Sequence, residues 1–410
     1  MAHPILSALW RNKTGPLLVA TQVALSLAIL ANALHIVHIR QAVAARPSGV
    51  ANEEQVFSME VRRLRLGNQQ DELALQQRET ATLRAVAGVT SVAATTQSPL
   101  TRSGTYGGLT TDRKQLVSQA NTTNYMVGDS IVQTWGLKLV AGRDFNASDY
   151  VDIDMNTSDD YPRAVIVTQP LARKLFPGAD TVIGKTIYNG TGVSARAAQI
   201  VGVVERLQTP AAQISERGEF STIIPVHLTG MPGNDYTLRA EPGQRDRVMK
   251  EAAAALRAAS PTPIIVRTKS LEEYRNDRYR ADNAMAWILV TVSVLLLLIT
   301  ASGIVGMASL WVTQRRKQIG VRRALGARRV DILRYFLAEN FMITSGGVAA
   351  GVLLALGLNQ LLVSQFEMAR LPPGYLATGA AMFWALGVLA VYGPAWRAAG
   401  ISPAIATRSA

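Results

Sequence analysis

Four apolar runs along the chain are each long enough to cross a membrane. The first covers residues 16–39, and three more follow at 284–312, 336–363 and 375–396. A helix rises about 1.5 Å per residue, so about 20 apolar residues span a hydrocarbon core about 30 Å thick. The pattern predicts four transmembrane α-helices, with a large hydrophilic domain at 40–283 between the first helix and the second.

The first run also has an interpretation as a cleaved signal peptide. Arg11 and Lys13 precede it, and the segment 31–33 (ANA) is similar to a small-residue cleavage site. The apolar pattern continues to Ile39, however, which is longer than the apolar core of a signal peptide. We favour a retained helix, and a mature chain starting at Leu34 would contradict it.

Basic residues concentrate on one side of the predicted helices. The segment 313–335 has eight basic residues and one acidic residue, whereas residues 40–282 have 29 basic and 26 acidic residues. Basic loops stay in the cytoplasm. We therefore expect both termini (1–15 and 397–410) and the 313–335 segment to be cytoplasmic, and the large domain and the short loop 364–374 to be periplasmic. The net charge of +13 then sets the topology, and nucleic acid is not expected as a partner.

Composition excludes several classes of function. The chain is 48% hydrophobic and only 17% charged, which argues against an ordinary soluble enzyme. It has no cysteine and only four histidines, which removes disulfides and thiolate metal sites. The triplet 184–186 (GKT) is not a phosphate-binding loop, because Ala179 stands where the first glycine belongs. We expect no catalytic residue, no metal site and no cofactor bound by this chain.

The large domain begins and ends with the same succession of elements. Alternating apolar residues predict strands, and apolar residues at helical spacing predict the helices between them. A strand, a helix and a strand are expected at 56–61, 69–86 and 89–94, and again at 236–240, 244–259 and 264–268. Two β-α-β units in these places predict a split, ferredoxin-like pairing that brings the two ends of the domain together.

A β-rich insertion is expected between these units, at about 104–208. It is rich in Gly, Thr and β-branched residues, and has strand candidates at 164–168, 186–188 and 199–204. After the second unit, the charged segment 271–282 has no helix breaker before the second apolar run. The sequence therefore predicts one continuous helix from the domain through the membrane, able to carry motion across it.

An acidic stretch at 149–160 invites a calcium interpretation. Asp152 and Asp154 begin like an EF-hand loop, but Thr157 replaces its glycine and Arg163 replaces its last carboxylate. We favour a solvated acidic loop.

Some polar and small residues inside the apolar runs are candidates for helix contacts. His35 and His38 share one face near the outer end of the first run, and we favour a position at the lipid headgroups over contact with a partner helix. Small residues suited to close packing, within the chain or with a second copy, are Gly303, Gly306, Gly347 and Gly351.

The basic segment 313–335 reads TQRRKQIGVRRALGARRVDILRY. Gly320 and Gly326 are expected to divide it into a basic continuation of the second span, a turn and a short helix. A topology signal that also binds anionic lipid headgroups would need this charge. It would not need the ordered spacing of glycines.

That spacing resembles the MacB/FtsX-type permease family of ABC transporters, sometimes called type VII. The stretch 314–327 matches the family signature R-x-x-E-I-G-x-R-x-A-x-G-A, and 394–404 is similar to its P-A-x-R-A-A-x-x-x-P ending. Within the domain, 135–145 and 171–178 look like motifs of the MacB-like periplasmic core. The resemblance implies that 313–335 is a coupling element that docks on an ATPase. The residues assigned to coupling are Arg315, Arg316, Gln318, Ile319, Gly320, Arg322, Arg323, Ala324, Leu325 and Gly326.

The resemblance also implies a function and partners. We expect a permease subunit in the bacterial inner membrane that works with a cytoplasmic ABC ATPase dimer, which binds the ATP and Mg²⁺. Export of a peptide, antibiotic or other compound by mechanotransmission is favoured. A lipoprotein-releasing permease and a non-transporting, FtsX-like regulator or sensor remain as alternatives. A second permease copy and membrane lipids are expected partners, and a periplasmic adaptor with an outer-membrane channel is an option.

Two positions depart from the family pattern. Gln318 stands where the signature has an acid, and Arg328 stands where Ser or Thr often caps the next helix. Both changes make the docking surface more basic. Pairing with a different permease that supplies the acid is one interpretation, and a homodimer is the other.

Overall fold

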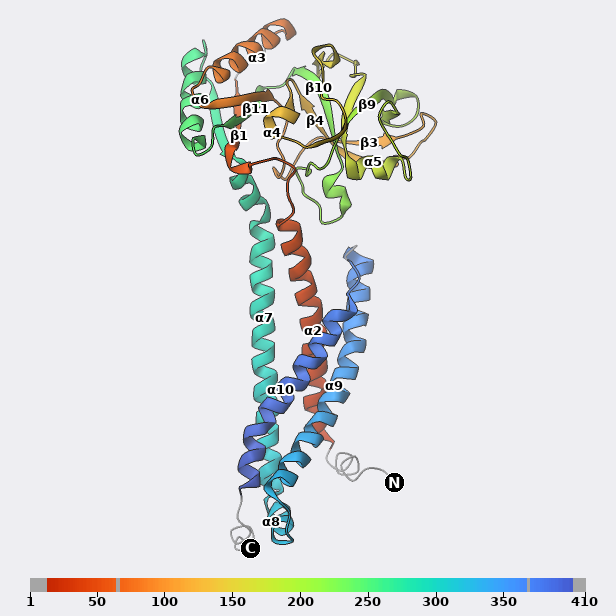
Figure 1. Ribbon diagram of the computed structural model, residues 1–410, viewed down its shortest axis with the longest axis vertical. Coiled ribbons are helices and arrows are strands. Elements are labelled where there is room, and N and C mark those ends of the chain that lie inside the picture. The colour runs from red at the N-terminus through yellow and green to blue at the C-terminus, as the bar shows by residue number, and fades with distance from the viewer. Residues whose placement is uncertain (1–12, 64–66, 367–368, 401–410) are drawn as a thin grey trace. The chain divides into compact units, whose positions relative to one another are not determined.

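The computed structural model describes residues 13–63, 67–366 and 369–400. The chain divides into two compact units (Figure 1). The helical unit consists of residues 1–41 and 282–410, and the α+β unit consists of residues 42–281. The described residues include four helices that are long and apolar enough to span a membrane. The predicted class, four such helices with a large α+β domain between the first two, is confirmed.

All four membrane helices are longer than the apolar runs that predicted them, because backbone hydrogen bonding continues into their polar ends. The third helix differs most from expectation. It begins at Arg329 rather than at residue 336, so the short helix expected at the end of the 313–335 segment is continuous with the third span. The four helices are α2 (Thr14–Ala44), α7 (Leu271–Gln314), α9 (Arg329–Phe366) and α10 (Pro373–Ala399).

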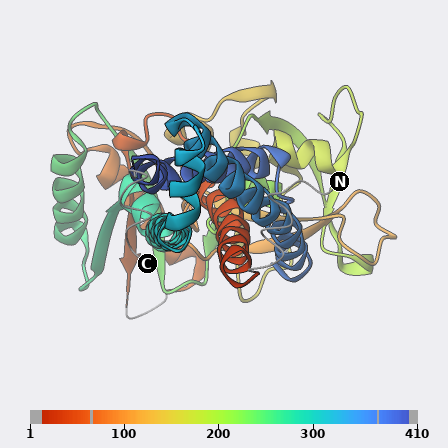
Figure 2. The same ribbon diagram turned by 90° about the horizontal axis from the view of Figure 1, so that it is seen from below.

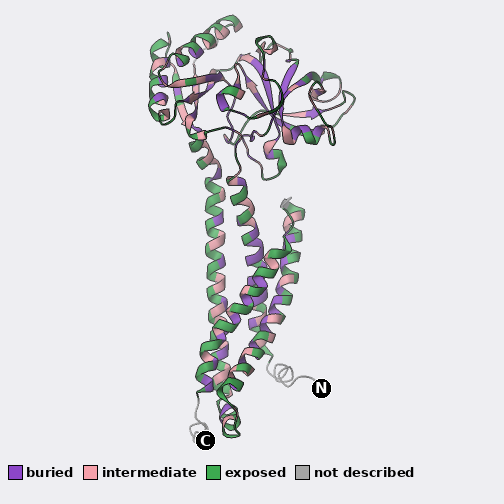
Figure 3. Ribbon diagram, viewed as in Figure 1, coloured by how far each residue is buried: buried purple, intermediate pink, exposed green. Residues whose placement is uncertain are grey.

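Helix α2 forms the centre of the helical unit. Figure 2 looks along the helices and shows α2 (red) among α7, α9 and α10. Val23 and Leu27 of α2 are completely buried in the shared apolar core. In the most apolar stretch of each helix, 56% of α2 is buried but only 17% of α7. Figure 3 shows the exposed surface along α7. The first apolar run is therefore part of the packed core of this unit.

The α+β unit contains a four-stranded antiparallel sheet in the order β12-β1-β11-β2. Strand β11 lies between β1 and β2, and β1 lies between β11 and β12, so both β-α-β units are split. The predicted ferredoxin-like pairing is confirmed, since β1 and β12 pair at the two ends of the domain. The elements are β1 (Val56–Arg62), α3 (Gln69–Arg84), β2 (Val89–Ala94), β11 (Gly233–Ala240), α6 (Arg245–Ala259) and β12 (Ile265–Ser270).

Alternation along β1 explains how the sheet binds its helices. Phe57, Met59 and Val61 point to the same face and are fully buried against α3 and α6. Val248 and Leu256 belong to the buried stripe of α6 that meets them. Burial of these apolar side chains is the main stabilising contribution to this half of the unit.

The second half of the unit is a small β-barrel. Its strands follow the order β4-β3-β8-β9-β7-β10, and pairing of β10 with β4 closes the circle. These strands are β3 (Tyr106–Thr110), β4 (Ala120–Val127), β7 (Ala164–Thr168), β8 (Thr186–Asn189), β9 (Arg196–Val204) and β10 (Ser221–Thr229). Helices α4 (Ile131–Trp135) and α5 (Gln169–Leu175) and the short strands β5 (Leu139–Gly142) and β6 (Val151–Asp154) complete it.

The predicted limit of the β-rich insertion at residue 208 is wrong. Strand β10 lies beyond that limit, yet it pairs with β4, β6 and β7. The insertion therefore extends to Thr229. The partners of β10 lie about 55 to 100 positions earlier in the chain, and local patterns carry no information about such distant pairing.

Candidate functional site

The segment 313–335 folds as a helix and a tight turn between two membrane helices. Helix α7 ends at Gln314, Arg315 interrupts it, and α8 (Arg316–Ala324) follows. The chain reverses at Gly326, whose φ of +96° lies in the left-handed region that glycine adopts readily. Gly320 was expected at a division but lies buried inside α8. Gly320 therefore does not form the turn.

One face of α8 is anchored in the helical unit. Ile319 is 4% exposed and packs in the same apolar core as Ile332 and Phe336 of α9 and Ala395 of α10. Gly320 beside it is also buried. This apolar contact joins α8 to α9 and α10.

The opposite face of α8 is exposed and basic. Val321 is 52% exposed and Leu325 is 83% exposed, so two aliphatic side chains stand uncovered among positive charges. The guanidinium of Arg322 lies 4.9 Å from the centre of the Tyr335 ring, a cation–π contact. The other exposed residues among those assigned to coupling are Arg316, Gln318, Ala324 and Gly326, while Arg323 is half-buried. Such a surface fits a partner with an apolar groove and acidic rim.

Arg315 is held by a buried carboxylate that sequence reasoning missed. Its Nη1 atom donates to Oε2 of Glu339 on α9 at 2.7 Å, and Glu339 is 1% exposed. Burial acts to lower the pKa of Arg315, but the hydrogen bond and charge of Glu339 outweigh it and raise that pKa. The sequence signal was a single acid within the third predicted span.

The helix after the turn is capped without the expected Ser or Thr. Arg328 occupies that position, and its backbone N–H donates to the Asp331 carboxylate at 2.9 Å. Asp331 also places a negative charge in the first turn of α9, where it interacts favourably with the positive end of the helix dipole. The departure at Arg328 is thus compensated locally.

Three of the four candidate packing glycines contact α2. A Cβ atom at Gly347 would lie 2.7 Å from the Ala20 carbonyl oxygen, and one at Gly351 would lie 3.0 Å from Ala24 atoms. At Gly303 a Cβ atom would lie 2.4 Å from the Gln22 side chain. Gly306 has no such neighbour within 4 Å, so among these four only its surface is open to lipid or another chain.

The histidine prediction is half wrong. His35, expected at the headgroups, is 5% exposed and its ring lies 5.3 Å from the Tyr375 ring, because α10 packs over this part of α2. His38 is exposed.

In the acidic loop, the Asp152 carboxylate accepts a hydrogen bond from Nδ1 of His227 at 2.8 Å, and the Asp154 carboxylate accepts one from the Asn156 backbone N–H. The described residues contain no cluster of three or more side chains arranged to hold a metal ion.

Comparison with known families assigns both units. The sequence profile of the FtsX-like permease C-terminal domain matches residues 290–403, which include the whole 313–335 segment. The profile of the MacB-like periplasmic core domain matches residues 18–259, more than half of the chain. The chain belongs to the MacB/FtsX permease family. The resemblance inferred from its motifs is thereby confirmed, and the chain has the build of a transporter permease.

Members of this family with similar sequences include larger proteins. The macrolide export ATP-binding/permease protein MacB of Agrobacterium fabrum is 28% identical over 309 residues, which cover 72% of this chain and 44% of that protein. The pyoverdine export ATP-binding/permease protein PvdT of Pseudomonas savastanoi pv. phaseolicola is 36% identical over 131 residues, which cover 32% of this chain and 20% of that protein. The chain thus spans less than half the length of these relatives.

Proposed function

We propose that this chain is the permease subunit of an ABC exporter in the bacterial inner membrane. A separate cytoplasmic ATPase dimer binds ATP and Mg²⁺ and moves the 313–335 segment, and the α+β unit responds in the periplasm. The cargo class is a peptide, an antibiotic or another compound. The names of the two relatives, which concern macrolide and pyoverdine export, favour export over the regulatory alternative.

The observation that carries this proposal is the two-sided character of α8. Ile319 and Gly320 are buried on one side of the helix, while Val321, Arg322 and Leu325 are exposed on the other. A helix with one buried face and one exposed basic face can bind a partner and transmit the partner's movement to the helices against which it packs.

Transmission through the membrane relies on α7 and α2. Helix α7 is continuous for 44 residues, which is roughly 66 Å at the helical rise. It is tied to α2 by the Ser26–Thr300 hydroxyl pair at 2.9 Å and by the ion pair between Arg40 and Asp282. Hydrogen bonds between membrane helices resist separation because lipid offers no alternative partner. The two helices are therefore expected to move as a pair.

A second permease copy completes the proposed assembly. The most apolar stretch of α7 is 17% buried, and Trp287 is 73% exposed on it. Lipid and a second copy both suit this apolar surface. A homodimer is favoured over a heterodimer, because Glu339 of the same chain supplies the carboxylate for Arg315. Gln318 is exposed, so an acid from a different permease is not needed there.

The proposal is tested by reversing charge on the exposed face of α8. Arg322→Glu should abolish capture and stimulation of the ABC ATPase that co-purifies with the chain, measured in proteoliposomes, while thermal stability stays unchanged. Arg370→Glu, an exposed arginine outside the 313–335 segment, is the matched control and should behave as wild type. Full ATPase stimulation by Arg322→Glu would refute the assignment.

The periplasmic partner separates the export proposal from its alternatives. A photo-crosslinker placed at exposed positions of the α+β unit should capture an adaptor protein if the chain is an exporter. Capture of a lipoprotein would indicate lipoprotein release, and capture of a cell-wall hydrolase would indicate regulation. Either result would replace the export proposal while leaving ATPase coupling intact.

A further inference from the structure

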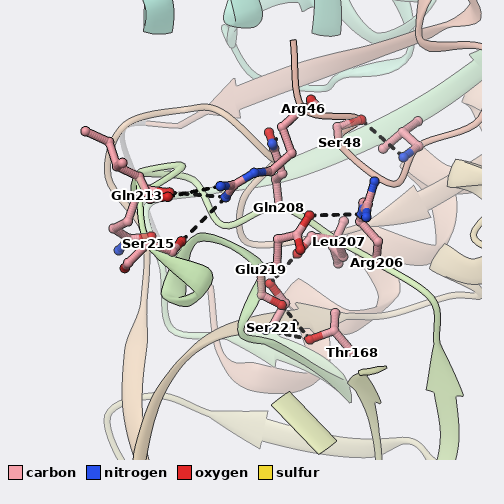
Figure 4. Close-up of polar contacts among 12 residues, drawn as sticks. Arg46, Ser48, Thr168, Arg206, Leu207, Gln208, Gln213, Ser215, Glu219 and Ser221 are labelled. Carbon is pink, nitrogen blue, oxygen red and sulfur yellow. Dashed lines mark hydrogen bonds and ion pairs between the residues drawn. The ribbon is translucent and has the colours of Figure 1, made fainter. Parts of the chain in front are cut away.

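One loop of the α+β unit is held by arginines from both ends of that unit. Residues 209–219, here the 209–219 loop, lie between β9 and β10. Arg46 follows the last residue of α2 by two positions, and Arg278 lies in the second turn of α7. Figure 4 shows the polar contacts around Arg46. Two helices that enter the unit separately therefore meet on one short segment.

Arg46 binds the backbone of the loop. Its Nη2 atom donates to the Ile214 carbonyl oxygen at 3.0 Å, and its Nη1 atom donates to the carbonyl oxygen of Gln213 at 3.3 Å. A Cβ atom at Gly218 would lie 3.0 Å from Nη1 of Arg46 and 2.3 Å from the Gln213 oxygen. The absence of a side chain at Gly218 is thus required for this contact.

Arg278 binds the same loop at the residues just before those that Arg46 contacts. Its Nε atom donates to the Ala211 carbonyl oxygen at 2.8 Å, and its Nη2 atom donates to the Ala212 carbonyl oxygen at 3.3 Å. One turn before it on α7, Nη1 of Arg275 donates to the Ala44 carbonyl oxygen at 3.0 Å and so holds the end of α2. The loop and both helix ends form one hydrogen-bonded junction.

Backbone strain is concentrated at this junction. Within the described residues, the non-glycine residues in the left-handed region are Asn52, Leu100, Arg102 and Ala212. Ala212 lies in the loop with φ of +42°, and the Arg102 N–H donates to the Pro210 carbonyl oxygen at 2.9 Å. Asn52 precedes Glu53, which forms an ion pair with Arg275. Strained residues persist where surrounding contacts over-determine them, and they gather in segments that switch.

The base of the loop is fixed to the barrel. The Ser221 hydroxyl donates to the Leu207 carbonyl oxygen at 2.9 Å, and the Thr168 hydroxyl donates to the Glu219 carbonyl oxygen at 2.6 Å (Figure 4). A pocket of about 360 Å³ lies between loop and barrel, with Ser215 and Arg217 among the residues of the loop that line it. Because the base is fixed and the tip follows two arginines, displacement of the tip must change this pocket.

We propose that the 209–219 loop reshapes this pocket when α2 and α7 move, and that Arg46 and Arg278 are the positioning residues that transmit the movement. This inference rests on the proposed function, which supplies the nucleotide-driven movement of the helices. The pocket then alternates between two shapes within each ATP cycle. The two arginines determine how much the pocket changes for a given movement of the helices.

The test uses two reporters in the full chain, assembled with its co-purifying ATPase in lipid nanodiscs. The chain has no cysteine, so engineered thiols are labelled selectively. A bimane fluorophore at Glu216→Cys, quenched by Lys174→Trp, reports on the pocket, because both positions line it. Spin labels at Leu34→Cys and Ile288→Cys, which are 39% and 62% exposed, report on α2 and α7.

Both reporters should change between the nucleotide-free and ATP-trapped states. In Arg46→Gln and in Arg278→Gln the helix reporter should still respond, while the pocket response falls roughly two-fold or more. Arg46→Lys, which keeps the charge and one hydrogen bond, should respond between these levels and serves where the glutamine variant folds poorly. Arg267→Gln, an exposed arginine of β12, is the matched control and should respond fully.

Each result distinguishes this inference from the proposed function. A pocket response that is silent in wild type, or that survives in both glutamine variants, overturns the inference while a responding helix reporter leaves the proposed function standing. If ATP changes neither reporter, the proposed function fails, and the inference fails with it.

Discussion

Two arginine-centred junctions in this protein use different chemistry. In the helical unit, Arg315 is matched by a carboxylate, Glu339, that is 1% exposed. In the α+β unit, Arg46 and Arg278 are half-buried and donate to backbone carbonyl oxygens of the 209–219 loop. A deeply buried charge requires a counter-charge, whereas a charge that keeps contact with water requires only hydrogen bonds.

The difference separates stability from coupling. Removal of Glu339 leaves the half-buried Arg315 without its counter-charge and its hydrogen-bond acceptor, so the cost is expected to fall on folding. Removal of Arg46 or Arg278 would release a loop whose base remains bonded to the barrel, so under our proposal the cost is expected to fall on transmission. Four substitutions test this contrast, in order of decreasing expected effect.

The largest effect is expected from Glu339→Gln. The neutral amide leaves the half-buried Arg315 without its counter-charge, which should destabilise the chain by about 3 kcal/mol, the lower end of the range for a broken buried pair. The measurement is unfolding in detergent, followed by heat or denaturant. The double variant Arg315→Met with Glu339→Leu removes both charges and should recover most of the loss. A stability of Glu339→Gln within error of wild type would remove the contrast between the two junctions.

The next effect tests whether close packing around α2 matters as much as the ion pair. Gly347→Val places atoms against the Ala20 carbonyl oxygen and Val23, and overpacking of this kind costs up to about 3 kcal/mol. Gly306→Val is the matched control, because nothing described lies within 4 Å of its Cβ position. Equal stability of the two variants would show that α2 and α9 separate at little cost. Loss of dimer in Gly306→Val alone would place that glycine at a contact between copies.

The third effect concerns the carboxylate at the α+β junction, that of Glu53. Burial acts to raise the pKa of Glu53, but hydrogen bonds from Arg275 and Ser48 outweigh it and hold that pKa below its ordinary value of 4.5. The stabilisation is therefore complete above about pH 4.5 and disappears as pH falls through the lowered pKa. Arg275→Gln should cost about 1–2 kcal/mol at neutral pH.

This cost should shrink in acid, because protonated Glu53 no longer distinguishes wild type from the variant. Thermal unfolding of both proteins between pH 3 and pH 7 measures the difference. A difference that stays constant over this range would mean that Glu53 takes no part in the pair.

The smallest effect is expected at an exposed pair. Arg247 and Glu251 lie four positions apart on α6, and each side chain is 45% exposed. Arg247→Gln should change the free energy of unfolding by only about 0.5 kcal/mol, and added salt should abolish the difference. A cost comparable to that of Arg275→Gln would show that burial does not set the strength of these pairs.

Local patterns predicted much of the fold. Phe57, Met59 and Val61 alternate as a half-buried strand must, and the four apolar runs have the length that a membrane requires. The split β-α-β pairing followed from the order of the elements. The position of β10 in the barrel did not, since its partner β4 lies about 100 residues earlier and chain closure over that distance leaves no local signature.

The sequence predicted where the candidate site lies along the chain, but not which of its residues are buried or how they pair. The spacing of Ile319, Gly320 and Gly326 located the turn-and-helix segment, yet it misassigned the role of Gly320. Glu339 was visible as an acid beside an apolar run, but nothing local paired it with Arg315, 24 positions away. The contacts of Arg46 with residues 213–215 span about 170 positions and had no sequence signal at all.

The sequence by itself determined where the chain is apolar, which segments carry the positive charge and how many helices are long and apolar enough to cross a membrane. These properties depend on composition within about 20 residues, and transfer energies act on that scale. The tertiary structure decided which arginine meets a carboxylate and which meets a backbone oxygen. That choice depends on burial, and burial exists only once distant segments have packed together.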